Sequence, residues 1–96
     1  MTRPAATIHA AYSVSTSKRH GYTSYWAKAA VTDEGFPGYN TVRSGIGDTA
    51  IEALDNAIGY VIEAYRNDGS EPPASTIIYG RVPRADIESV SFIKRH

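Results

Sequence analysis

Apolar and polar residues alternate along the first part of the chain. In residues 7–16 the even positions from Ile8 to Val14 are apolar or aromatic, whereas the odd positions include a histidine and two serines. This period of two is typical of a half-buried strand. Residues 22–32 are rich in aromatic and β-branched types, and residues 39–46 follow a turn with glycine and proline. We therefore expect three successive strands in an antiparallel meander.

The pattern changes to a helical period after the third predicted strand. Apolar side chains recur there at steps of three and four residues, which places them on one stripe of a helix that faces the sheet. Burial of a side chain of this size contributes about 1.5 to 3 kcal/mol, so the helix is expected to be the main contributor to the core. The stripe consists of Ile51, Leu54, Ile58, Val61 and Tyr65.

A second, shallower stripe widens the apolar arc of this helix beyond what one sheet has to cover. It contains small residues and a tyrosine and predicts a homo-oligomer, a dimer or larger. Gly59 lies mid-helix at a cost of about 1 kcal/mol relative to alanine, which indicates close approach of another element. The residues assigned to the oligomer interface are Ala53, Ala57, Tyr60 and Ala64.

Two glycines precede the helix in the stretch GIGDT, residues 45–49, and suggest a phosphate-binding loop. A P-loop needs a lysine at fixed spacing and a dinucleotide fingerprint needs a third glycine, and this stretch has neither. Asp48 would also compete with a phosphate for the positive end of the helix. Thr49 and Glu52 match a capping box instead, so the stretch is interpreted as a helix start.

The chain after the helix returns to short elements. Turn-forming residues and Gly69 are expected to end the helix near Arg66, and a linker with glycine and prolines follows. The pattern predicts a fourth strand over residues 76–82, a turn over residues 83–87 and a candidate fifth strand over residues 89–94.

The order of these patterns sets the expected fold class. A chain of 96 residues forms one domain, since single cores commonly occupy about 100 to 150 residues. We expect an α+β domain over residues 1–96, with a three-stranded antiparallel meander, one long helix packed on the sheet, and one or two further strands (β-β-β-α-β-β).

Charge and cysteine content narrow the classes of function. Ten basic and ten acidic residues cancel, so the overall attraction to nucleic acid that a strongly basic domain shows is missing. There is no cysteine for a disulfide or a thiolate metal site. No apolar run approaches the roughly 18 residues that span a bilayer. We expect a cytoplasmic protein with no membrane contact.

Candidate catalytic chemistry is sparse. His9, His20 and His96 lie in distant segments without metal-ligand spacing, and each is interpreted as a solvated or partly packed side chain. No serine lies in a Gly-x-Ser-x-Gly elbow. We predict no catalytic residue, no metal site and no cofactor.

A series of short motifs runs from residue 31 to residue 75. An acidic turn ending in Pro-Gly, a strand, Gly-Asp-Thr, a Glu-Ala-Leu helix with an Asn-Ala step, and a stop of glycine and prolines follow one another. This run resembles the HicB antitoxin family. The residues that carry the resemblance are Asp33, Pro37, Gly38, Gly47, Asp48, Thr49, Glu52, Ala53, Leu54, Asn56, Ala57, Gly69, Pro72 and Pro73.

The resemblance implies a single HicB-like domain that binds and masks a partner instead of catalysing a reaction. It implies a small sheet backed by one helix, a truncated ribonuclease-H-like layout, and a small RNA-cleaving toxin as the protein partner. HicB-like proteins usually form dimers or larger assemblies and usually carry a C-terminal DNA-binding module. The stretch after the fourth predicted strand is too short for a helix-turn-helix, so operator binding is not expected of it.

The ribonuclease-H-like layout also raises the hypothesis of a nuclease. Two-metal phosphoryl chemistry needs several carboxylates that converge on ions about 4 Å apart. Such nucleases resemble one another in carrying acids in the first strand, on the helix and at the end of the fourth strand. Glu52 matches the helix acid, but neither strand holds one. A metal-dependent nuclease is therefore disfavoured.

Aromatic and arginine residues supply the candidate binding surface. The meander has more aromatic residues than one small core needs, and aromatic and arginine side chains are favoured at interfaces and stacking sites. A protein partner and, alternatively, an anion such as a nucleotide phosphate are the expected ligands. The second hypothesis is a phage-type counter-defence protein that inhibits a host nuclease complex or sequesters a nucleotide signal. The residues assigned to binding are Tyr25, Trp26, Tyr39, Arg43, Arg81 and Arg84.

Overall fold

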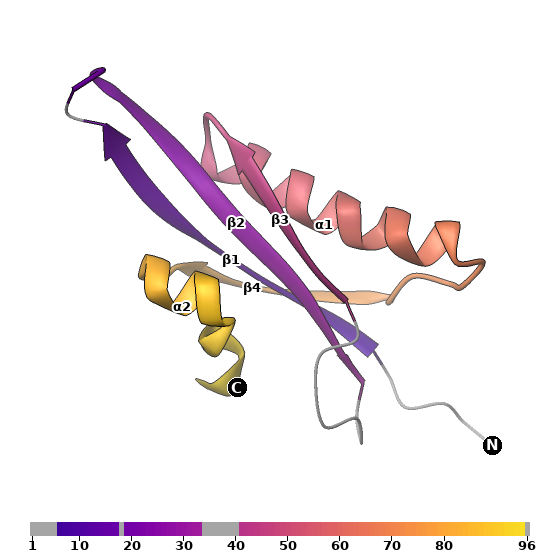
Figure 1. Ribbon diagram of the computed structural model, residues 1–96. Helices are drawn as coiled ribbons and strands as arrows, with labels where there is room; N and C mark the ends of the chain where they lie inside the picture. Colours follow the sequence, from indigo (N-terminus) through magenta and orange to yellow (C-terminus); the bar gives the residue numbers. More distant parts are fainter. Residues whose placement is uncertain (1–5, 18, 34–40, 96) are drawn as a thin grey trace.

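The computed structural model describes residues 6–17, 19–33 and 41–95, which form one mixed sheet, one long helix and a short C-terminal helical segment (Figure 1). The predicted α+β class with the order β-β-β-α-β is confirmed. The elements are β1 (Ala6–Ser17), β2 (Tyr22–Asp33), β3 (Thr41–Gly47), α1 (Ala50–Asn67), β4 (Ser75–Arg81), α2 (Arg84–Ser89) and the 3-10 helix η1 (Ser91–Arg95).

The four strands lie in the order β3-β2-β1-β4. β1 pairs with β2 and β2 with β3 in antiparallel orientation, as expected of the meander, whereas β4 pairs with β1 in parallel. β1 and β2 pair from Ala6 opposite Asp33 to Ser17 opposite Tyr22, but β3 and β4 pair with only part of them. The outer end of the β1–β2 hairpin therefore projects beyond its neighbours as a two-stranded arm (Figure 1).

Both ends of α1 are set by the predicted capping residues. Thr49 is the N-cap, and its Oγ1 accepts a hydrogen bond from the Glu52 amide at 3.1 Å. At the other end Gly69 has φ +76°, and the Ser70 amide donates to the Tyr65 carbonyl at 2.9 Å. This backbone bond is that of a Schellman motif, which satisfies a carbonyl that the helix leaves free. The interpretation of GIGDT as a helix start is confirmed.

α1 approaches β3 closely because glycines leave room for its backbone. A Cβ at Gly45 would lie 2.5 Å from the Ala53 carbonyl oxygen and 2.5 Å from the Ala57 amide nitrogen. A Cβ at Gly47 would lie 2.8 Å from the Ala53 amide nitrogen. Real Cβ atoms do not approach backbone atoms this closely, so the glycines of β3 and the alanines of α1 are matched to each other.

Four residues of the predicted stripe meet the core, Leu54 and Val61 within it and Ile58 and Tyr65 packed against it, and the close approach adds two alanines to the buried face. Ala53 and Ala57 are fully buried in the core of the protomer, so their assignment to an oligomer interface is wrong. Ile51, predicted to face the sheet, is 72% exposed. Tyr60 is 50% exposed and Ala64 is half-buried, so these two assigned residues remain at the surface. The first core cluster consists of Ile8, Ala10, Ala27, Ala29, Val31, Ala53, Leu54, Ala57 and Val61.

Gly59 makes no close contact with any described residue. A Cβ at this position would meet nothing within 4 Å. The close approach that its place in the helix suggested is therefore absent from the part of the chain that the structure describes.

The opposite face of the sheet is covered by the C-terminal segment (Figure 1). Ile87, Val90 and Phe92 pack there against Ala11 and Ala30, whose side chains alternate to the side away from α1. Phe92 is fully buried. The sheet therefore has a core on each face, the larger beneath α1 and the smaller beneath α2 and η1.

The sequence did not predict the helical form of this segment. Residues 83–87, expected as a turn, begin α2, and residues 89–94, the candidate fifth strand, end α2 and form most of η1. Val90 terminates α2 in a left-handed conformation with φ 57°. Val90 and Phe92 alternate with polar residues as in a strand, but this bend between two helical segments lets both side chains enter the second core.

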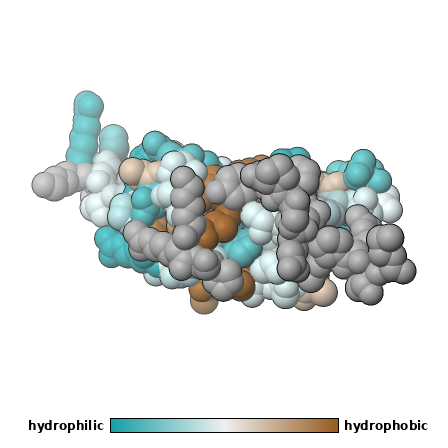
Figure 2. All heavy atoms as spheres, turned by 90° about the horizontal axis from the view of Figure 1, so that it is seen from below, coloured by the Kyte–Doolittle hydropathy of each residue, from teal (hydrophilic) through white to brown (hydrophobic). Residues whose placement is uncertain are grey.

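Large apolar side chains at the surface are scattered over several elements. In the view of Figure 2, hydrophobic residues reach the surface in the middle and at the lower edge between polar ones. Among the described residues, no helix has the length and hydrophobicity to cross a membrane. The exposed large apolar residues are Tyr22, Ile46, Ile51, Tyr60 and Ile78.

Candidate functional site

A tryptophan, an arginine and an isoleucine gather on the sheet face that carries α2. Trp26 on β2 lies directly opposite Ile46 on β3, so the two side chains share one face. Arg84, the first residue of α2, places its guanidinium carbon 4.0 Å from the Trp26 ring centroid, a cation–π geometry. We call Trp26, Ile46 and Arg84 the tryptophan patch.

The arginine of the tryptophan patch is held in place from two sides. Besides its stacking on the indole, Arg84 Nε donates to Glu88 Oε1 at 3.1 Å, one turn along α2. The tryptophan itself is half-buried, whereas Ile46 is 57% exposed. The patch therefore presents a fixed aromatic and cationic group beside an apolar side chain that water still reaches.

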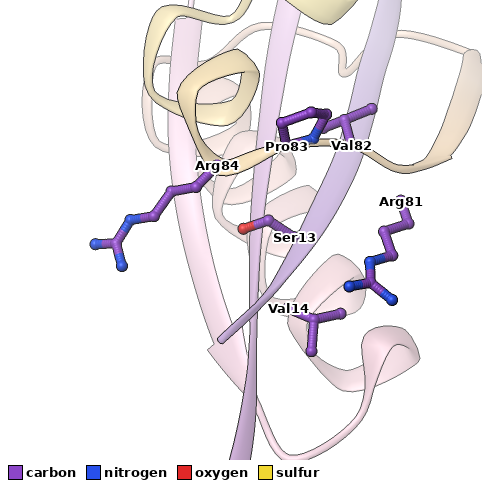
Figure 3. Close-up of a pocket in the computed structure, with 6 residues that line it drawn as sticks. All are labelled: Ser13, Val14, Arg81, Val82, Pro83 and Arg84. Carbon is purple, nitrogen blue, oxygen red and sulfur yellow. The ribbon is translucent and has the colours of Figure 1, made fainter. Parts of the chain in front are cut away.

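An open depression lies next to Arg84, between β1 and the end of β4 (Figure 3). Its volume is about 380 Å³. We call it the arginine depression, and its lining residues are Ser13, Val14, Arg81, Val82, Pro83 and Arg84.

A bulge in β4 shapes the arginine depression. Ala10 pairs with Ile78, but Tyr12 pairs with Arg81, so β4 has one more residue than β1 over this stretch. Gly80 lies within the bulge with φ +88°, a conformation that residues with a Cβ rarely adopt. Such a bulge redirects the side chains that follow it, which brings Arg81 to the wall of the depression.

Arg43 is not brought to the same place as Arg81 and Arg84. β3 and β4 form opposite edges of the sheet, so Arg43 lies at the far edge. Its Nη1 donates to the Val42 carbonyl at 2.8 Å. Arg43 instead lines a smaller depression of about 290 Å³ that also includes Tyr60, Glu63, Ala64 and Asn67.

Two tyrosines assigned to binding lie apart from the tryptophan patch. Tyr25 alternates to the α1 side of β2 and is half-buried, with its ring centroid 6.2 Å from that of Tyr12. It does not share a face with Trp26. Tyr39 lies outside the described residues.

A partly buried chain of polar side chains on the α2 face was missed by the sequence analysis. His9, expected to be solvated or partly packed, is only 4% exposed. Its Nδ1 lies 2.7 Å from Tyr79 Oη and its Nε2 lies 2.9 Å from Thr32 Oγ1. Burial raises the pKa of Tyr79. These hydrogen bonds link β4, β1 and β2 through their side chains. The only sign of them in the sequence was the alternation along β1, which puts His9 on the other face of the strand from Ile8.

Acidic and histidine side chains do not converge within the described residues. No group of three or more His, Asp or Glu side chains there is arranged to hold a metal ion. Glu52 is exposed in the first turn of α1, and the ring of His20, also exposed, stacks on Tyr22 at 6.0 Å between centroids.

Comparisons of the chain with protein-family models, with curated proteins and with solved structures find no significant match.

Proposed function

We propose that the chain is a non-enzymatic binding module that sequesters a protein partner, resembling a stand-alone HicB-like antitoxin whose partner is a small basic RNA-cleaving toxin. The order β-β-β-α-β, with one long helix on one face, agrees with the layout that the resemblance implies. The observation that carries the proposal is the stack of Arg84 on Trp26 beside the exposed Ile46.

The composition of the tryptophan patch supports a role in partner binding. Tryptophan and arginine are the residue types that most often dominate the energy of an interface, with losses of about 2 kcal/mol or more on truncation. Covering the exposed part of Ile46 would contribute about 1 to 2 kcal/mol, since full burial of such a side chain contributes about 1.5 to 3 kcal/mol. These terms fit the centre of a larger interface, because association itself costs about 4 to 15 kcal/mol.

The patch is also organised before a partner arrives. Arg84 already contacts Trp26 and Glu88, so less side-chain freedom is lost on binding than for a free arginine. Glu88 compensates the charge of Arg84, and Lys28, whose Nζ donates to the Glu88 carbonyl at 3.5 Å, adds one positive charge beside the patch.

The test compares two exposed isoleucines. Tagged wild-type protein, Ile46→Glu and the matched control Ile51→Glu are expressed in the native host, and co-purifying proteins are identified by mass spectrometry. We expect one protein to be retained by the wild type and by Ile51→Glu but lost with Ile46→Glu. Equal retention by both variants, or the absence of a retained protein, would contradict the proposal.

We also propose that the chain forms homodimers through the exposed side of α1. Tyr60 is 50% exposed and shares its depression with Ala64 and Arg43, which gives this side an aromatic and a cationic group. Tyr60→Glu is expected to reduce the mass measured by light scattering to that of a folded monomer. An unchanged mass, whether monomeric or dimeric, would count against this contact.

A further inference from the structure

Among the described residues, no strand flanks the outer end of the β1–β2 hairpin. β4 pairs with β1 only as far as Tyr12, and β3 pairs with β2 only as far as Tyr25. We call the part beyond them, residues 14–17 and 19–24, the arm, and Figure 1 shows it projecting from the sheet. A two-stranded ribbon is marginally stable in water by itself and gains stability when a third strand or a helix packs on it. The arm is therefore a surface that a partner would stabilise.

One face of the arm is built from serines and one exposed tyrosine. Ser15 pairs with Ser24 and Ser17 pairs with Tyr22, and paired residues of antiparallel strands point to the same face. Tyr22 is 58% exposed. Serine side chains are short, so the backbone of a helix can come close to this face. We call Ser15, Ser17, Tyr22 and Ser24 the serine face.

The charges of the chain are separated along the sequence, although they sum to zero. Residues 1–32 contain four basic residues and no acidic one, and Arg19 is exposed in the turn of the arm. Residues 48–71, which include α1, contain six acidic residues and one basic residue, and all six acidic residues are exposed. Neither Arg19 nor these acidic residues form an ion pair with any described residue. The arm and α1 are therefore complementary in charge.

One exposed row of α1 has the shape and the charge to receive the arm. Asp55, Gly59 and Glu63 are exposed and follow one another at steps of four residues, so they lie in one row along the helix. We call these three residues the acidic row. A glycine in mid-helix costs about 1 kcal/mol relative to alanine, and a Cβ at Gly59 would meet nothing within 4 Å. A contact with another chain would account for this glycine, because the missing side chain leaves room between the two carboxylates.

We propose that the arm of one copy of the chain packs across the acidic row of a second copy. In this contact the serine face lies over Gly59, and Arg19 lies beside the carboxylates of Asp55 and Glu63. Two-fold symmetry repeats the contact, since the arm of the second copy packs across the acidic row of the first. The opposite charges of the two surfaces fix their orientation.

A second copy fits the arm better than a nucleic acid does. Phosphates would be attracted to Arg19 but repelled by the six carboxylates of residues 48–71, whereas a second copy supplies those carboxylates as the opposite charge. The inference rests on the homodimer proposed above and names the surface that meets α1 in it. Glu63 connects the two contacts, because it also lines the depression that contains Tyr60.

The test exchanges the charges of the two surfaces. Arg19→Glu makes the turn of the arm acidic, and Asp55→Lys combined with Glu63→Lys makes the acidic row basic. We expect the wild type to dimerise in sedimentation equilibrium and each variant alone to have a Kd about tenfold higher or more, because its contacts bring like charges together. An equimolar mixture of the two variants is expected to form heterodimers with a Kd near that of the wild type, since both contacts again join opposite charges.

Glu71→Lys is the matched control, because it reverses a charge at an exposed position beyond the end of α1 and is expected to leave the Kd unchanged. Circular dichroism checks that each variant is folded. A dimer that tolerates both exchanges, or variants that do not pair when mixed, would overturn the inference and leave the contact at Tyr60 standing. A monomeric wild type would overturn both proposals. Binding of duplex DNA that is lost in Arg19→Glu, measured by fluorescence anisotropy, would assign the arm to nucleic acid instead.

Gly59→Ala reports on the same contact without a change of charge. Its methyl group would fill the space between the arm and the helix, so the Kd of the dimer is expected to rise about tenfold. In dilute protein, where the monomer predominates, the same substitution only adds helix stability. An unchanged Kd would overturn the placement of the arm over Gly59.

Discussion

Replacement of Gly45 by alanine tests the packing of α1 on β3 most sharply. The added Cβ would lie 2.5 Å from two backbone atoms of the helix, Ala53 O and Ala57 N, and 2.9 Å from Asn56 Cβ. Backbone atoms cannot turn away as a flexible side chain can. To restore the 3.4 Å at which ordinary contact begins, α1 would have to move by about 0.9 Å from β3.

The cost follows from the core beneath the helix. Overpacking of a well-packed core costs about 1 to 3 kcal/mol, and a clash with two backbone atoms belongs at the upper end of this range. Alanine recovers about 0.5 to 1 kcal/mol because it restricts the unfolded chain more than glycine does. The net loss in the free energy of unfolding is therefore expected to be about 2 kcal/mol, or about 8 to 16 °C in Tm for a domain of this size.

Gly59→Ala is the matched control, because it adds the same methyl group where nothing lies within 4 Å. Helix propensity predicts a gain of about 0.8 to 1 kcal/mol there. Urea unfolding followed by circular dichroism measures both variants. A Gly45→Ala protein as stable as the wild type would refute the close-packing argument, and a loss of stability in Gly59→Ala would show that another element covers this glycine.

Three further predictions concern the cap, the second core and the half-buried Tyr79. Thr49→Ala removes the acceptor of the Glu52 amide and is expected to cost about 1 kcal/mol in urea unfolding, whereas Thr49→Ser retains it; equal losses in both variants would contradict the capping role. Phe92→Ala empties the centre of the second core and is expected to cost about 3 to 5 kcal/mol and to speed cleavage of the C-terminal segment in limited proteolysis; unchanged cleavage would contradict the packing of η1. The pKa of Tyr79 is raised in the folded chain, so above its usual value, about 10, the unfolded chain loses the phenol proton first and the free energy of unfolding falls as pH rises. Tyr79→Phe should flatten this fall in stability. Identical profiles of stability against pH for the two proteins would contradict the prediction.

The strands and the ends of the helix could be predicted because local chemistry determines them. The side chains of Ile8 and His9 point to opposite faces of β1 in any sheet, because successive residues of a strand alternate. Thr49 caps α1 through a hydrogen bond to a residue three positions along the chain. The burial of Ala53 and Ala57 and the exposure of Ile51 were harder to predict, because large apolar side chains normally mark the buried face. The signal was present in the two glycines before the helix, which only small residues such as Ala53 and Ala57 can approach.

The C-terminal helix and the arginine depression depend on contacts that the sequence does not display. α2 has only six residues and a proline N-cap without a side-chain hydrogen bond, and the apolar residues Val90 and Phe92 alternate as in a strand. Ser13 and Arg81 line the same depression only because β4 pairs in parallel with β1 and carries a bulge at Gly80. The order of elements along the chain does not reveal that pairing. It was therefore not possible to predict that Arg43 and Arg81 lie at opposite edges of the sheet.

The most direct test of the proposed binding role is crosslinking from the tryptophan patch itself. A photoactivatable amino acid is placed at position 46 in one protein and at position 51 in another, and both are irradiated in the native host. We predict that position 46 crosslinks to a single protein partner and that position 51 does not. No crosslink from position 46, or the same products from both positions, would contradict the assignment of this face to partner binding.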